Sequence, residues 1–147
     1  MIFSFGHSER ERIEVDVHGY ERPATGEYWD DNWLNVDIRV QAGGFRGNTA
    51  ATIITSELTK FLSELRPLLE TLRGTAKFST MEGQLKLKLD GDGKGHIELR
   101  GEVADQPGIG NCLNFTLQFD QSQLRASVRE LERVTTKLPV RGSLSAG

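Results

Sequence analysis

The strongest constraint on the fold is a change of hydrophobic period that occurs twice along the chain. Near the C-terminus, apolar residues first alternate and then recur every three or four positions: Leu113, Phe115, Leu117, Phe119, then Leu124, Val128, Leu131, Val134, Leu138. A strand-like run ending at Ile54 is followed in the same way by Leu58, Phe61, Leu62, Leu65, Leu68, Leu69 and Leu72. Alternation is typical of a half-buried strand and the longer period of an amphipathic helix. The pattern therefore predicts antiparallel sheet with packed helices.

Further alternating segments bring the expected number of strands to about eight, mostly antiparallel. In the first half of the chain they cover residues 2–5, 13–20, 34–41 and 48–54, and in the second half they include Phe78, Leu87, Leu99 and Phe115. The predicted fold class is α+β, with two amphipathic helices packed on one face. Each half follows a ββββα order, which is either a pseudo-repeat or a coincidence, because the halves share no evident residue identity.

Local signals place the ends of the two helices. Thr55 or Ser56 is expected to cap the first helix, which continues with a kink through Pro67 and stops at a left-handed Gly74. The second helix begins with a capping-box pattern, Asp120 followed by Gln123.

The hairpin around residues 90–95 has two registers that suit its charges. One sets Lys88 opposite Glu98 and Asp90 opposite His96, and the other sets Lys86 opposite Glu98. Either register explains the charges as cross-strand pairs, each of which stabilises a sheet by about 0.2–1 kcal/mol.

A chain of 147 residues is expected to form one domain. We assign residues 1–138 to a single α+β domain and residues 139–147, which are small and polar after Pro139, to a flexible C-terminal tail. The single cysteine, Cys112, excludes an internal disulfide and fits a reducing compartment. Charged residues interrupt the N-terminus before any secretory segment, and no apolar run reaches membrane-spanning length. We therefore expect a cytoplasmic protein without a membrane partner.

Charge is unevenly distributed along the chain, although the net charge is only −3. Residues 1–37 carry nine acids and three bases, whereas residues 38–147 carry 12 acids and 15 bases. The acidic residues of this N-terminal third either face a basic partner or lie on the solvent-exposed faces of the strands. A basic stripe, Arg125, Arg129, Arg133 and Lys137, follows the second helix. We interpret it as a solvated helix face, and we expect no direct binding of nucleic acid.

Motifs with chemical meaning are weak in this sequence. The segment DGDGKG at 90–95 suggests a calcium loop, but Lys94 takes a ligand position and Gly101 stands where a bidentate acid belongs. His7, His18 and His96 are far apart, and no nucleophile, zinc-protease or phosphate-loop motif is present. We therefore expect no enzyme activity, no catalytic residues, no metal and no cofactor.

The acidic segment 21–32, expected to be a long loop, leads into the most promising set of contact residues. Both tryptophans of the chain lie together in the set Tyr28, Trp29, Asp30, Asp31 and Trp33. Tryptophan and tyrosine dominate binding hot spots, and the aspartates can meet Arg or Lys of a partner. The set is our candidate partner-binding site; the alternative is that the rings cover one end of the core.

Several segments, in order along nearly the whole chain, carry a resemblance to a known family: GYERP, DDNWLNVDIRV, GGFRG, TSELTKFLSEL, AKFSTMEGQLKLKL, GHIEL and NCLNFTLQFDQSQL. The sequence resembles the family named after the immunity protein of the wall-associated toxin WapA. The resemblance implies an α+β cytoplasmic protein. It also implies binding, since the namesake protects a cell by binding the tRNA-cleaving domain of a contact-delivered toxin. It implies no catalytic residues.

The resulting hypothesis is a non-enzymatic binding protein of the immunity type, which occludes a cognate toxin domain. Two other functions remain open. One is a domain that binds a small ligand between sheet and helices, and the other is a self-associating homo-oligomer.

Overall fold

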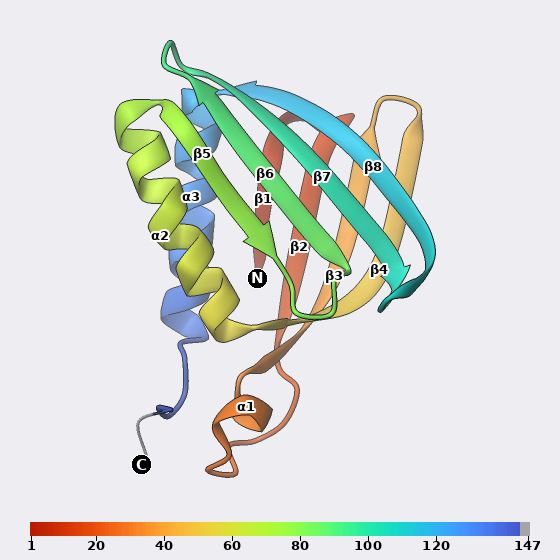
Figure 1. Ribbon diagram of the computed structural model, residues 1–147, viewed down its shortest axis with the longest axis vertical. Helices are drawn as coiled ribbons and strands as arrows, with labels where there is room; N and C mark the ends of the chain where they lie inside the picture. The colour runs from red at the N-terminus through yellow and green to blue at the C-terminus, as the bar shows by residue number, and fades with distance from the viewer. Residues whose placement is uncertain (145–147) are drawn as a thin grey trace.

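A computed structural model describes residues 1–144 and shows two four-stranded antiparallel sheets, joined and flanked by helices (Figure 1). The first sheet has the order β1 (Ile2–Ser8), β2 (Glu11–Tyr20), β3 (Trp33–Ala42), β4 (Phe45–Ile54). The second has the order β5 (Arg73–Ser79), β6 (Leu85–Asp92), β7 (His96–Gln106), β8 (Ile109–Asp120). The helices are α1 (Tyr28–Asp31), α2 (Thr55–Thr71) and α3 (Gln121–Lys137). The α+β class and the repeated ββββα order are confirmed.

The core lies between the two sheets, because every strand turns one set of alternating residues inward. Phenylalanines link the layers at its centre. The ring of Phe5 in β1 lies 6.2 Å from that of Phe119 in β8 and 5.8 Å from that of Phe61 in α2. Phe61 in turn lies 5.0 Å from Phe78 in β5. One contiguous apolar cluster therefore joins both sheets and the helices.

The two long helices lie side by side along one open side of the sheet pair (Figure 1). α2 follows the first sheet in sequence but packs along β5, an edge strand of the second sheet. α3 follows the second sheet but packs along β1, an edge strand of the first. Each half of the chain therefore covers an edge of the other half's sheet.

The ends of α2 differ from the expectation, whereas the start of α3 confirms it. Thr55 and Ser56 do not cap α2, because the N-cap position is occupied by Ile54, which makes no side-chain cap hydrogen bond and whose N–H donates to Glu57 Oε1 at 2.7 Å. The left-handed residue at the other end is Leu72, with φ 61°, and not Gly74, which lies in β5. At α3, the side chain of Asp120 accepts from the backbone N–H of Ser122 and Gln123, as predicted.

Both registers proposed for the β6–β7 hairpin are wrong. Asp90 lies opposite Glu98, and Lys88 lies opposite Arg100. The strands extend further toward the turn than the glycines suggested, since β6 ends at Asp92. The charged residues instead form ion pairs with residues two positions away on the same strand. Lys88 Nζ lies 3.9 Å from Asp90 Oδ2, and Arg100 Nε lies 2.8 Å from Glu98 Oε1.

Candidate partner-binding site

The segment between β2 and β3 projects beyond the ends of the sheets and carries α1 (Figure 1). We name residues 21–32 the α1 lobe. The sequence predicted an irregular loop throughout, but residues 28–31 form one helical turn, in which the N–H of Asp31 donates to the carbonyl of Glu27 at 2.9 Å. The turn brings the aromatic and acidic residues of the segment into a defined arrangement.

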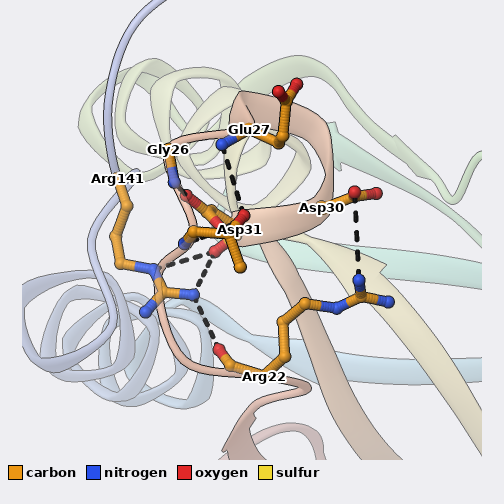
Figure 2. A network of polar contacts seen from close by, with 7 residues as sticks. Arg22, Gly26, Glu27, Asp30, Asp31 and Arg141 are labelled. Carbon is orange, nitrogen blue, oxygen red and sulfur yellow. Dashed lines mark hydrogen bonds and ion pairs between the residues drawn. The ribbon is translucent and has the colours of Figure 1, made fainter.

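Asp31 holds the α1 lobe together from the inside (Figure 2). Its carboxylate accepts hydrogen bonds from Thr25 N at 2.7 Å, Thr25 Oγ1 at 2.8 Å and Gly26 N at 2.8 Å. These bonds, led by the one from the Thr25 backbone, lower the pKa of Asp31 below its ordinary value. Because the side chain is buried, its role is to shape the lobe.

Arg141, beyond the end of α3, clamps the lobe from the other side (Figure 2). Its guanidinium donates from Nε to the carbonyl of Asp31 at 2.8 Å and from Nη2 to the carbonyl of Arg22 at 3.0 Å. It also stacks 3.6 Å above the ring of Tyr20, whose hydroxyl donates to the carbonyl of Pro139 at 2.6 Å. Pro139 and Arg141, which we assigned to the tail, are therefore bound to the domain; residues 145–147 of the tail lie outside the described residues.

Asn32 connects the lobe, the tail and α2. The side chain is fully buried. Its Nδ2 donates to the carbonyls of Tyr28 at 2.7 Å and Arg141 at 2.8 Å. Its Oδ1 accepts from Arg141 N at 2.8 Å and from Thr55 Oγ1 at 2.7 Å. Sequence reasoning missed both Asn32 and Arg141, because an asparagine before a strand and an arginine in a polar tail have no distinctive pattern.

The five predicted contact residues separate into two groups. Trp29 and Asp30 are exposed, whereas Tyr28 is half-buried: Trp29 is 48% exposed, and its ring lies 5.1 Å from that of Tyr28 in an edge-to-face arrangement. Asp30 is exposed, and its Oδ2 lies 3.8 Å from Arg22 Nη1. Asp31 is buried, and Trp33 is half-buried as the first residue of β3. The lobe therefore presents one exposed ring, a second half-buried ring beside it and one exposed carboxylate on a braced support.

The acidic third of the sequence does not form one acidic face. On the outer face of the first sheet, Asp16 and Asp37 lie directly opposite each other. Asp16 Oδ1 lies 3.5 Å from the N-terminal ammonium group, and Asp37 Oδ2 lies 2.9 Å from His18 Nε2. Much of the acidic excess of the sheet is thus balanced locally, and the exposed acids of the lobe, Glu21, Glu27 and Asp30, stand apart from it.

The other residues with chemical potential have structural partners. The carboxylate of Asp92 accepts from the backbone N–H of Lys94 and His96 and so shapes the turn, and these bonds lower its pKa. Cys112 is exposed and donates to Glu102 Oε1; desolvation, with Glu102, raises the pKa of the thiol. Within residues 1–144, no group of three or more His, Cys, Asp or Glu side chains is placed to hold a metal ion. No helix in the same residues has the length and apolarity to cross a membrane.

Residues 3–139 match the sequence profile of the immunity protein WapI-like family. Among curated proteins, none matches the chain.

Solved structures share the fold at low sequence identity. WHY1 from Arabidopsis thaliana superposes with a TM-score of 0.52 at 13% identity, over 94% of this chain and 90% of that one. MRP1/MRP2 of Trypanosoma brucei superposes with a TM-score of 0.50 at 12% identity, over 92% of this chain and 84% of that one. At these identities the likeness concerns the fold alone.

Proposed function

The chain belongs to the immunity protein WapI-like family, and we propose that it is a cytoplasmic, non-enzymatic inhibitor that binds a bacterial toxin domain and occludes its active site. The contact surface that we propose is the outer side of the α1 lobe, with Trp29 at its centre, Tyr28 beside it, and Asp30 and Glu27 around them. The observation that carries this choice is Trp29, an aromatic side chain left 48% exposed on a segment that is otherwise braced by partly buried hydrogen bonds.

Rigidity and charge both favour this surface. Asn32 and Arg141 hold the lobe in place before binding, so little conformational entropy is lost when a partner docks. Aromatic rings on such a support supply large contact area at low entropic cost. The exposed carboxylates suit a basic surface, which a nuclease needs in order to hold its phosphate-rich substrate.

Co-expression tests the proposal directly. Any toxin domain that the neighbouring upstream gene encodes is expressed alone and together with this protein, growth is recorded, and the mixture is examined by gel filtration. We expect restored growth and a stoichiometric complex. Unaltered toxicity together with the absence of a complex would remove the proposal for that pair.

Two substitutions locate the interface. Trp29→Ala is expected to weaken toxin binding by about tenfold or more, since hot-spot aromatics contribute about 2 kcal/mol. Its effect on stability is expected to be small because Trp29 is largely exposed. Phe45→Ala is the matched control, an aromatic residue of β4 that is 69% exposed away from the lobe. If Trp29→Ala and Phe45→Ala bind the toxin domain with equal affinity, the interface does not lie on the α1 lobe.

Trp33→Ala separates contact from support. Trp33 is half-buried and pairs with Ile54 at the start of β3. We expect this variant to lose binding together with stability, whereas Trp29→Ala loses binding alone. Calorimetric titration and urea unfolding of both variants measure the two quantities.

A further inference from the structure

The outer face of the first sheet contains a hollow of about 690 Å³, and none of the proposed contact residues lines it. Three arginines line it, one from each of three adjacent strands: Arg12 in β2, Arg39 in β3 and Arg46 in β4. The volume lies in the range of about 300–1,000 Å³ that is usual for sites that bind small molecules.

The register of the sheet explains why these side chains converge. Arg12 lies opposite Gln41, and Gln41 lies opposite Arg46. In the next row on the same face, Arg39 lies between Glu14 and Asn48. Residues two apart in a strand share a face, so the two rows form a continuous patch of three guanidinium groups and two amides around the hollow.

The positive charge of the patch is only partly neutralised. Glu14 serves two arginines: its Oε1 lies 2.9 Å from Arg12 Nε, and its Oε2 lies 3.9 Å from Arg39 Nη1. Glu9 also lines the hollow, but within residues 1–144 it forms no ion pair with any of the three arginines. Arg46 has no carboxylate partner among those residues. The hollow thus holds one more cationic than anionic side chain.

One hydrogen-bond donor of the patch is also unused. Among the described residues, Arg12 Nε is buried and has no hydrogen-bond partner, since the nearby Glu14 oxygen does not lie in its donor direction. Buried donors nearly always have a partner in folded proteins. A guanidinium group presents five N–H donors in a fork that matches the oxygens of a phosphate or carboxylate.

We propose that this hollow binds a small polyanion, a molecule with two or more adjacent phosphate or carboxylate groups. In this proposal the guanidinium groups of Arg39 and Arg46 donate hydrogen bonds to the oxyanions of the ligand. The side-chain amides of Gln41 and Asn48 donate further hydrogen bonds. The guanidinium group of Arg12 then pairs with an oxyanion of the ligand in place of Glu14. The site is separate from the α1 lobe and does not depend on the toxin-binding proposal.

Calorimetric titration with pyrophosphate and, separately, with citrate tests the site, at constant ionic strength. We expect saturable binding of at least one of the two, which weakens by about tenfold or more in Arg46→Ala because a charge-assisted pair is lost. Arg46 is exposed, so circular dichroism should show an unchanged fold. Arg125→Ala is the matched control, an exposed arginine on α3.

The two probes distinguish the sources of the anion: binding of pyrophosphate alone indicates a phosphorylated ligand, and binding of citrate alone indicates a polycarboxylate. Backbone amide shifts should concentrate in β2, β3 and β4. The absence of saturable binding up to about 10 mM, or equal weakening by Arg125→Ala, would overturn the proposal.

Discussion

Asn32 shares one side-chain amide among three segments that lie far apart in the sequence. It bonds to Tyr28 in the α1 lobe, to Arg141 beyond α3 and to Thr55 at the start of α2. A buried amide with its partners in place stabilises a structure only modestly, but removing it leaves several buried groups without partners. Asn32 therefore helps to fix the position of the lobe relative to α2 and the end of the chain.

Asn32→Ala is therefore expected to lower the free energy of unfolding by about 1–3 kcal/mol, the cost of leaving buried polar groups unsatisfied. Urea unfolding measures the loss. Asn35→Ala is the control, because Asn35 is exposed on β3 three residues further on, and it should be nearly neutral. Equal stability of the two variants would show that the network around Asn32 contributes little.

Asp31 makes the stability of the lobe depend on pH. Its hydrogen bonds lower the pKa of the folded carboxyl group below the unfolded value. The stabilisation is therefore complete above the unfolded pKa of about 3.9, and it is lost as the pH falls through the lower, folded value. Asp31→Asn should be less stable than the natural protein at neutral pH, and the gap should narrow below about pH 4.

Urea unfolding at neutral and acidic pH tests the pH dependence of Asp31→Asn. Asp30→Asn serves as the control, because Asp30 is exposed and makes only a 3.8 Å contact with Arg22. A stability gap for Asp31→Asn that stays constant across this range would contradict the role assigned to its charge.

At the scale of elements, each long helix protects a sheet edge with a glutamate at the same position. Glu130 of α3 accepts from Ser4 N in β1 at 3.1 Å, and Glu64 of α2 accepts from Lys77 N in β5 at 3.0 Å. Both are the tenth residue of a 17-residue helix. Unpaired strand edges are templates for association with other chains, so these contacts satisfy the backbone where a neighbouring strand is missing.

The shared positions favour a pseudo-repeat over coincidence. In α2 the N–H of Ile54 donates to Glu57, and in α3 the N–H of Asp120 donates to Gln123, at the same two positions of the helix start. The similarity lies in the contacts and not in residue identity, and for this reason comparison of the two half-sequences does not reveal it.

Glu130→Ala and Glu64→Ala should each lower the free energy of unfolding by about 1–2 kcal/mol, because a hydrogen bond to a charged group is lost at the strand edge. Amide hydrogen exchange should become faster at Ser4 in the first variant and at Lys77 in the second. Glu70→Ala is the control, an exposed acid of α2. Unchanged exchange at both amides would show that the helix backbone alone covers the edges.

At the scale of the whole molecule, the lobe and the chain end form one unit attached to the sheets. Within residues 1–144 the last buried apolar residue is Val134, and Leu138 is the last apolar residue that packs, partly buried, against the core. Among the described residues, the hydrogen bonds of Pro139 and Arg141 go to Tyr20, Arg22 and the neighbouring pair Asp31 and Asn32. The end of the chain therefore braces the lobe and contributes little to the core.

A chain that ends at Leu138 should fold cooperatively but carry a loosened lobe. We expect faster cleavage within residues 21–32 in limited proteolysis, with mass spectrometry to locate the cuts, because that segment loses its clamp. Arg141→Ala in the full chain should reproduce part of this effect. Failure of the shortened chain to fold would contradict the domain boundary at residue 138.

The sequence by itself determined the order of the strands and of the two long helices, the faces they bury, the Asp120 cap and the family. Hydrophobic period and capping act over a few residues, so these features are visible locally. Only the tertiary structure decided which edge each helix covers, which aspartate of the lobe is buried and how Asn32 and Arg141 brace it. The physical reason is that a polar side chain acquires its role from partners distant in sequence, and those partners meet it only when the core has formed.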